Sequence, residues 1–119
     1  MNRVCRPVLY VVLLLTSHVL ASYAEESESI DRRDTNILFA EGKVLLRRGK
    51  AEEAYETLYA AFEQSPQNLD INFWLGRAAF ETENYESAVM AFERIVIAQP
   101  DNHRAMLELA RSYYNLELY

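Results

Sequence analysis

The 119-residue chain is long enough for one small domain, and its formal net charge at pH 7 is −6. All 18 acidic residues follow Ala24, together with ten of the 12 basic ones, so the chain after Ala24 carries a net charge of −8. This acidity disfavours nucleic acid as a ligand, because proteins that bind a phosphate backbone usually present a basic surface.

The first 24 residues differ in composition from the rest of the chain. Two arginines make the start positive, an unbroken apolar run extends from Val8 to Leu15, and Ser22 and Ala24 are small residues at the spacing of a cleavage site. The pattern predicts a secretory signal peptide over residues 1–24, cut between Ala24 and Glu25. The alternative is an uncleaved signal, which would be the protein's one membrane contact. Polar residues interrupt the apolar run before it reaches the roughly 20 residues of a membrane span.

Cys5, the one cysteine of the chain, lies inside this predicted leader. The mature chain would therefore have no thiol for a disulfide or for redox chemistry. Export without cysteines is common in a bacterial periplasm, and we expect that location for this protein.

The folded part is expected to begin after a polar spacer. Residues 25–34 are charged and polar, which predicts disorder. From there on, apolar and small residues recur at helical spacing, in pairs of short segments. The first pair is predicted to run from Thr35 to about Arg48 and then to about Gln64, with a turn at Gly49 and with Asp34 or Thr35 as the helix cap.

The second pair carries the same start and stop signals. Asn68 and Asn84 can cap its two helices by accepting hydrogen bonds from free backbone amides. Pro66 ends the first pair and Pro100 ends the second, because proline disfavours helix in the residue before it. A third pair begins after Asn102, and the chain stops after the first helix of that pair.

The pairs repeat every 34 residues, as Thr35–Asn68, Leu69–Asn102 and the incomplete His103–Tyr119. Small residues, alanines, prolines and core positions recur in register: Gly42, Gly76 and Ala110; Ala54 and Ala88; Pro66 and Pro100; Leu38, Leu45, Leu58 and Ala61 in the first repeat; Leu75 and Phe92 in the second; Met106, Leu109 and Tyr113 in the third. This spacing resembles the tetratricopeptide repeat. Departures occur at Glu41 and Asn72, and milder ones at Ala79 and Ile95.

The resemblance implies an all-α fold, in which tandem helical hairpins stack as a short right-handed superhelix. The small residues Gly42, Gly76 and Ala110 are expected where the two helices of a pair cross closely, since a larger side chain would push the helices apart. Ala54 and Ala88 would supply the facing surface.

The resemblance also implies a concave groove, built from the first helix of each pair. Carried over by position, three rows line it, with two further residues beside them: Phe39, Phe73 and Leu107; Lys43, Arg77 and Arg111; Leu46, Phe80 and Tyr114; and Trp74 and Arg104. A row of cations can pair with carboxylates of a bound peptide, while the aromatic neighbours supply contact area. The alternative is that the cations only pair with nearby glutamates, such as Glu41 and Glu108, on a solvated face.

A carboxylate clamp for chaperone tails, which is known in the family, is disfavoured here. Its five polar places fall on Phe39, Lys43, Trp74, Arg104 and Glu108, and only Arg104 keeps the required basic character. Trp74 lies on the groove side of a core position. It is expected either to pack between neighbouring first helices or to act as a binding hot spot.

The last predicted helix presents an apolar stripe that no second helix covers: Met106, Leu109, Ala110, Tyr113 and Tyr114. A terminal repeat normally has a polar outer face. Either the chain is a fragment of a longer protein, or a partner associates with this uncovered face. Leu118 and Tyr119 are interpreted as the start of the missing helix.

The sequence carries no signal for catalysis. Without the leader, His103 is the one histidine, and the three glycines form no phosphate-binding loop. We therefore expect no metal, no cofactor and no enzyme activity. The prediction is a non-catalytic protein–protein interaction module of the cell envelope that binds a polypeptide in its groove. One alternative is the N-terminal periplasmic segment of a larger outer-membrane assembly, secretion or polysaccharide-export protein. Another is the regulatory domain of an enzyme with its catalytic domain downstream.

Overall fold

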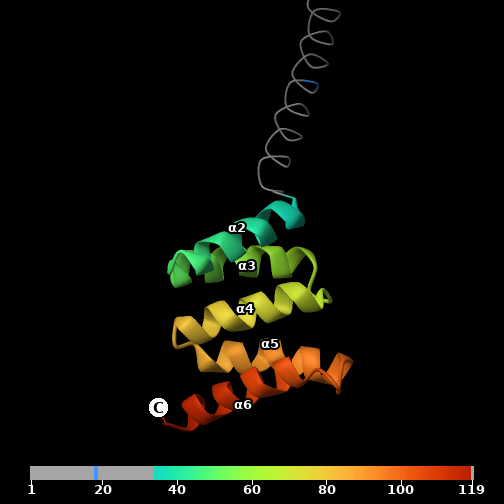
Figure 1. Ribbon diagram of the computed structural model, residues 1–119. Coiled ribbons are helices and arrows are strands. Elements are labelled where there is room, and N and C mark those ends of the chain that lie inside the picture. Colours follow the sequence, from blue (N-terminus) through green and yellow to red (C-terminus); the bar gives the residue numbers. More distant parts are fainter. Residues whose placement is uncertain (1–17, 19–33, 119) are drawn as a thin grey trace, which may run out of the picture. The chain divides into compact units, whose positions relative to one another are not determined.

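The computed structural model describes His18 and residues 34–118. The predicted leader, apart from His18, and residues 25–33 of the predicted spacer lie outside the described residues. From Asp34 on, the chain forms one compact unit of five helices: α2 (Thr35–Arg47), α3 (Ala51–Gln64), α4 (Leu69–Glu81), α5 (Tyr85–Ala98) and α6 (His103–Leu118). They stack in chain order, and each lies against the next (Figure 1). The predicted all-α fold of tandem helical hairpins is therefore confirmed.

Short polar side chains define where four of the helices begin. The Asp34 carboxylate accepts from the backbone N–H of Asn36, at 2.9 Å. Three asparagines cap α4, α5 and α6 in the same way, and they are Asn68, Asn84 and Asn102. Each satisfies an amide that the helix cannot pair within its own first turn. None of the described helices has the length and hydropathy that crossing a membrane requires.

The turns inside the two complete pairs place a left-handed residue at the same position of the repeat. Gly49 has a φ of 77°, and Glu83, 34 residues later, has a φ of 59°. Glycine adopts this conformation without steric cost, whereas a glutamate is strained in it. The third equivalent, Glu117, stays helical. The prediction that Leu118 starts a new helix is therefore wrong: α6 runs on through Leu118, because no left-handed residue interrupts it.

The two helices of each complete pair cross at a glycine. A Cβ atom built on Gly42 would lie 2.5 Å from Cγ of Leu58, and one built on Gly76 would lie 2.8 Å from Cζ of Phe92. Leu58 and Phe92 are both fully buried. The expectation of close crossings holds at these two glycines. Ala110, the third small residue, is exposed, because no described helix lies over it.

Successive pairs are joined by the other face of each first helix. Ile71 and Ala78 of α4 are fully buried against the first pair, and Ala105 and Ser112 of α6 are fully buried in the same register. Ile37 occupies the position of Ile71 in α2, but 57% of its surface is exposed. Among residues 34–118 no helix precedes α2 that could cover this face.

Asn72 stands where the repeat resemblance departs from an apolar residue. Its side chain is fully buried, and its amide nitrogen donates to the carbonyl oxygens of Pro66, at 2.9 Å, and of Asn68, at 2.8 Å. The side chain thereby fixes the turn between the first and second pairs to the first turn of α4. Its own carbonyl oxygen has no hydrogen-bond partner. Such a buried side-chain amide is tolerated because its NH₂ group donates two hydrogen bonds.

Candidate functional site

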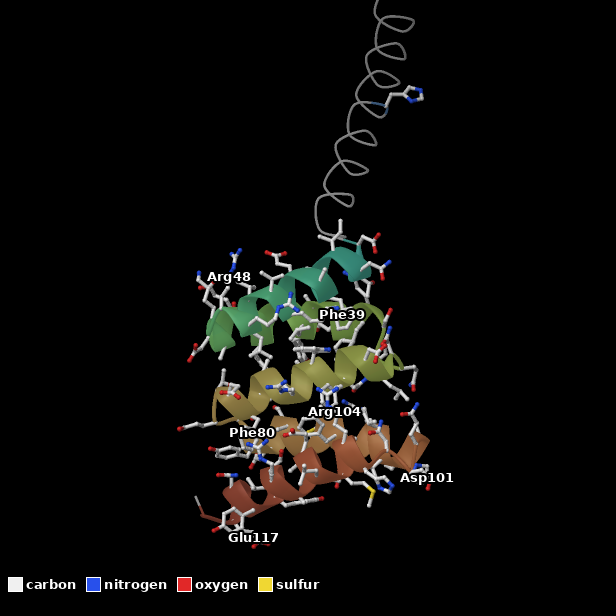
Figure 2. All side chains as sticks on the ribbon, viewed as in Figure 1. Phe39, Arg48, Phe80, Asp101, Arg104 and Glu117 are labelled. Atoms are coloured by element: carbon white, nitrogen blue, oxygen red, sulfur yellow. The ribbon has the colours of Figure 1, made fainter. Side chains whose placement is uncertain are left out.

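The eleven predicted groove residues all lie on α2, α4 and α6, the first helices of the three pairs. Each of these helices contacts the next one along the stack, α2 with α4 and α4 with α6. Figure 2 labels one groove residue from each of these helices, Phe39, Phe80 and Arg104. We keep the name groove for the face that these eleven residues form.

The first predicted row does not present three equivalent side chains. Phe39 is half-buried and Leu107 is 61% exposed, whereas only 9% of Phe73 is exposed. The ring of Phe73 packs edge-on against Phe92, with 5.7 Å between the ring centroids. Phe73 therefore belongs mainly to the core, and little of its surface is left for a ligand. The idea of a continuous row is corrected at this position.

The cations of the groove each lie against an aromatic ring. Lys43 Nζ is 4.2 Å from the ring centroid of Phe39, and the Arg77 guanidinium carbon is 5.7 Å from the Trp74 ring. Two arginines of α6 reach back to rings of α4: Arg104 lies 4.3 Å from the centroid of Phe73, and Arg111 lies 4.9 Å from that of Phe80. Each contact contributes on the order of 0.5–1 kcal/mol at an exposed site. A stacked guanidinium still has N–H donors at its edge, so it remains able to bind a carboxylate.

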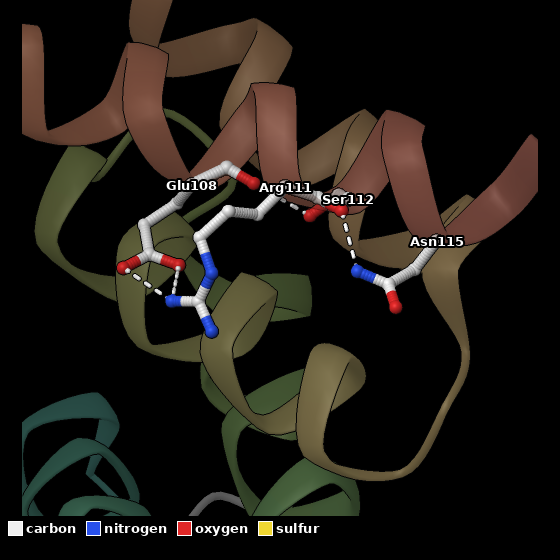
Figure 3. A network of polar contacts seen from close by, with 4 residues as sticks. All are labelled: Glu108, Arg111, Ser112 and Asn115. Atoms are coloured by element: carbon white, nitrogen blue, oxygen red, sulfur yellow. Dashed lines mark hydrogen bonds and ion pairs between the residues drawn. The ribbon is translucent and has the colours of Figure 1, made fainter.

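The alternative, that the cations pair with nearby glutamates, is seen at Arg111. Arg111 forms an ion pair with Glu108 one turn earlier, at 3.1 Å, and Figure 3 shows it beside the bonds of Ser112 and Asn115 to the backbone of the same helix. The pair is exposed on the Arg111 side. Such surface pairs are weak, at about 0–1 kcal/mol. A ligand carboxylate can therefore compete for Arg111.

The third row becomes more exposed toward the end of the stack. Leu46 and Phe80 are half-buried, and Phe80 packs edge-on against Tyr85 with 5.4 Å between centroids. Tyr114 is 66% exposed. The row therefore offers one rigid ring in the middle and one accessible phenol at the end, both of which suit a polypeptide ligand.

Trp74 packs between neighbouring helix pairs, which was one of the two expectations for it. The indole packs against the buried clusters of both complete pairs, and it meets the Phe73 ring edge-on at 6.3 Å. It also stays half-exposed, with the Arg77 guanidinium over it. The side chain thus braces neighbouring pairs and still contributes surface to the groove.

A polar pocket of about 280 Å³ opens between the start of α4 and the start of α6. Three groove residues line it, Phe73, Trp74 and Arg104. The other lining residues were not part of the groove prediction, and they are Asn68, Leu69, Asp70, Ile95, Gln99 and Asn102. Asn68 and Asn102 are 34 residues apart. That periodicity could have identified them as neighbours of the groove as well as helix caps.

Charge is unevenly divided between the first and second helices of the pairs. The second helices, α3 and α5, hold six acidic residues and one basic one, whereas α2, α4 and α6 together hold five of each. The groove therefore lies on the less acidic helices of an acidic protein. This distribution favours an anionic ligand in the groove over one on the opposite helices.

The apolar stripe predicted on the last helix is exposed in the structure except at Leu109, which is half-buried against the core. Met106 and Tyr113 are exposed, together with Tyr114. The Tyr113 hydroxyl donates to the Glu93 carboxylate of α5, which ties α6 to the helix before it. This hydrogen bond raises the pKa of Tyr113 above its ordinary value, with smaller contributions from desolvation and from the charge of Glu93. Because the pKa is raised in the folded state, the bond stabilises the fold at neutral pH and is lost only as pH rises into the alkaline range.

Within the part of the chain that the structure describes, no three His, Cys, Asp or Glu side chains lie close enough together to hold a metal ion.

Comparison with known proteins agrees with this architecture. The sequence profile of the tetratricopeptide repeat matches residues 39–103 and again residues 77–119. A tetratricopeptide repeat-containing protein of Caenorhabditis elegans, trd-1, is 30% identical over 105 residues, which cover 88% of this chain and 14% of that protein. PEX5-related proteins of Mus musculus and Rattus norvegicus are 34% and 35% identical over 77 residues, or 65% of this chain and 14% and 13% of theirs. The chain thus spans about one seventh of the length of these relatives. With its helical hairpins, its glycine crossings and its matching profile, the chain belongs to the tetratricopeptide-repeat family.

Proposed function

We propose that the chain is a non-catalytic protein–protein interaction module that holds an extended polypeptide in its groove, and that this polypeptide carries acidic side chains or a free C-terminal carboxylate. Tetratricopeptide repeats in general act as interaction scaffolds without catalysis of their own. The observation that carries the proposal is the set of four cations on the first helices, each held against an aromatic ring.

The stacked cations suit a carboxylate for two reasons. The ring beneath each guanidinium restricts its motion and removes part of its hydration, which strengthens a charge-assisted hydrogen bond made at its edge. The rings themselves also offer apolar surface to the methylene groups of the ligand. Arg77 and Arg104 both lie over rings of α4, so they define one centre of binding.

The polar pocket at Arg104 supports an extended backbone in this centre. Its amide side chains, among them Gln99 and Asn102, are of the kind that pairs with peptide N–H and C=O groups. Asp70 lines the same pocket and would repel a second carboxylate there. One carboxylate at Arg104, followed by a neutral stretch of backbone, is the arrangement that these charges favour.

Replacing Arg77 and Arg104 together by glutamine should weaken binding of an acidic peptide at least about tenfold, because each charge-assisted hydrogen bond is worth about 1.5–3 kcal/mol. The probe is a 12-residue peptide containing four glutamates, with a fluorescent N-terminal label, and the measurement is fluorescence anisotropy. A second version with an amidated C-terminus separates recognition of the terminal carboxylate from recognition of the side chains.

Arg94→Gln is the matched control for this experiment. Arg94 also stacks on an aromatic ring, 4.8 Å from the Phe62 centroid, but it lies on α5 and outside the groove. It should leave peptide affinity within about twofold of the parent chain, since distant charges are screened at physiological salt. An equal loss in both variants, or no loss in the double variant, would contradict the groove proposal.

The location of the module is also part of the proposal. The leader-like sequence of residues 1–24 supports export to the cell envelope, most simply to a bacterial periplasm. The exposed stripe on α6, with Met106, Tyr113 and Tyr114, favours one alternative function. In it the chain is the leading periplasmic segment of a larger outer-membrane assembly, secretion or polysaccharide-export protein. N-terminal sequencing of the cell-expressed protein tests the export proposal, and the reading frame beyond Tyr119 tests the alternative.

A further inference from the structure

A second surface of the molecule lies on α3 and α5, away from the groove. Six of its side chains form a band that we call the outer strip: Tyr55, Tyr59 and Phe62 on α3, and Met90, Arg94 and Ile97 on α5. Tyr59 is 44% exposed, Met90 is 55% exposed and Ile97 is more exposed still. Large apolar side chains gathered in this way are uncommon on a surface that serves no contact.

One wall of the outer strip is a row of aromatic rings along α3. The rings of Tyr55 and Tyr59 stack with 6.2 Å between centroids, and Tyr59 and Phe62 follow at 6.0 Å. Two contacts hold this wall to α5. The Tyr55 hydroxyl donates to Oγ of Ser87, at 3.3 Å, and the Arg94 guanidinium lies over the Phe62 ring. The wall is therefore held in place before any ligand arrives, which reduces the entropy cost of binding.

A shallow cleft of about 120 Å³ runs between this wall and α5. Its floor includes the buried side chains of Leu75 and Ala91, and Met90 lies at its edge. Methionine adapts its shape to different partners, and a rigid aromatic wall opposite it provides contact area. The cleft thus has the size and lining to receive one or two apolar side chains of a ligand.

Acidic residues flank the outer strip on both sides. Glu52, Glu56 and Glu63 lie within two helical turns of Tyr59 on α3, and Glu86 lies one turn before Met90 on α5. All four are exposed. Arg94 is the one cation on these two helices, and it lies against Phe62. An apolar centre with anionic borders is complementary to a segment that has apolar residues in the middle and cations on either side.

We propose that the outer strip docks a cationic amphipathic helix of a partner protein. Its apolar stripe enters the cleft between Tyr59 and Met90, and lysines or arginines on its flanks pair with the glutamates of α3 and α5. An apolar cleft is a common docking site for the apolar face of an amphipathic helix. The outer strip is separate from the groove, so one module would join an acidic polypeptide to a basic one.

The test uses a synthetic probe, an 18-residue peptide of leucine and lysine with leucines at helical spacing and with both ends blocked. Binding is measured by titration, and it is located by the shifts of backbone amide resonances in the labelled chain. We expect the shifts to concentrate on α3 and α5. Tyr59→Ala/Met90→Ala, which changes no charge, should weaken the probe at least about tenfold, as loss of two central contacts usually does.

Leu107→Ala/Tyr114→Ala is the control, because it removes two apolar side chains from the groove that are at least as exposed as Tyr59 and Met90, without changing charge. It should leave probe affinity within about twofold, since both sites lie outside the outer strip. Circular dichroism checks that each variant is folded. If Tyr59→Ala/Met90→Ala does not fold, the single variant Met90→Lys is used instead, because Met90 is exposed. It should lower the affinity for the probe peptide by a similar factor. Unchanged affinity in the strip variant, or shifts concentrated on α6 or the groove, would overturn the proposal.

Discussion

Shortening Ile71 to alanine is expected to lower the free energy of unfolding by about 3 kcal/mol, within the usual range for removing a buried isoleucine side chain. Only 1% of Ile71 is exposed, and it packs with Leu38 of α2 and Ala61 of α3. The loss would be a large share of the total, since small domains are stable by only about 5–15 kcal/mol. Urea denaturation followed by circular dichroism measures the loss.

Ile37→Ala is the control for this prediction, because Ile37 is the same residue type at the same position of the first repeat. With 57% of its surface exposed, its truncation should cost about 0.5 kcal/mol or less. Ile71 also joins the first pair to the second, so Ile71→Ala should broaden the unfolding transition as the two pairs begin to unfold separately. Equal losses in the two variants would show that burial between successive pairs is not what stabilises the stack.

The architecture could be predicted from the sequence because its signals are periodic. Glycines at a helix crossing, alanines opposite them and prolines after each pair all recur at 34-residue intervals. Gly42 and Gly76 do lie at crossings that a Cβ atom would fill. Each signal acts through local steric contacts, so it does not depend on the sequence in the rest of the chain. The helices accordingly begin within one or two residues of the expected places, although α6 runs past its expected end.

The candidate site was less predictable, because equal positions in a repeat do not have equal surroundings. Phe73 is covered by neighbours on both sides, whereas Leu107, one period later, lies at the end of the stack and is exposed. The reach of Arg104 back to Phe73 depends on the path of a long side chain between two helices. The buried hydrogen bonds of Asn72 depend on the turn geometry at Pro66. None of these follows from periodicity alone.

Gly76→Val should lower the free energy of unfolding by about 3 kcal/mol, the upper part of the range for overpacking a core. The added Cβ would lie 2.8–3.0 Å from three atoms of the Phe92 ring. That ring is fully buried and cannot move aside, because Phe73, Ala88 and Ile95 pack around it. Either α4 and α5 separate, or the ring leaves its rotamer. Replacing a helical glycine returns only a few tenths of a kcal/mol of helix propensity, so the clash dominates.

Ala110→Val supplies the control, since Ala110 is the equivalent small residue of the third repeat and is exposed. The change should cost about 0.5 kcal/mol, which is the difference in helix propensity between alanine and valine. A second variant identifies the clash itself. Shortening Phe92 to leucine in the Gly76→Val background should recover part of the lost stability, although Phe92→Leu alone is destabilising, because neighbouring substitutions are coupled. If Gly76→Val and Ala110→Val are equally mild, the close crossing of α4 and α5 cannot be what excludes a side chain at position 76.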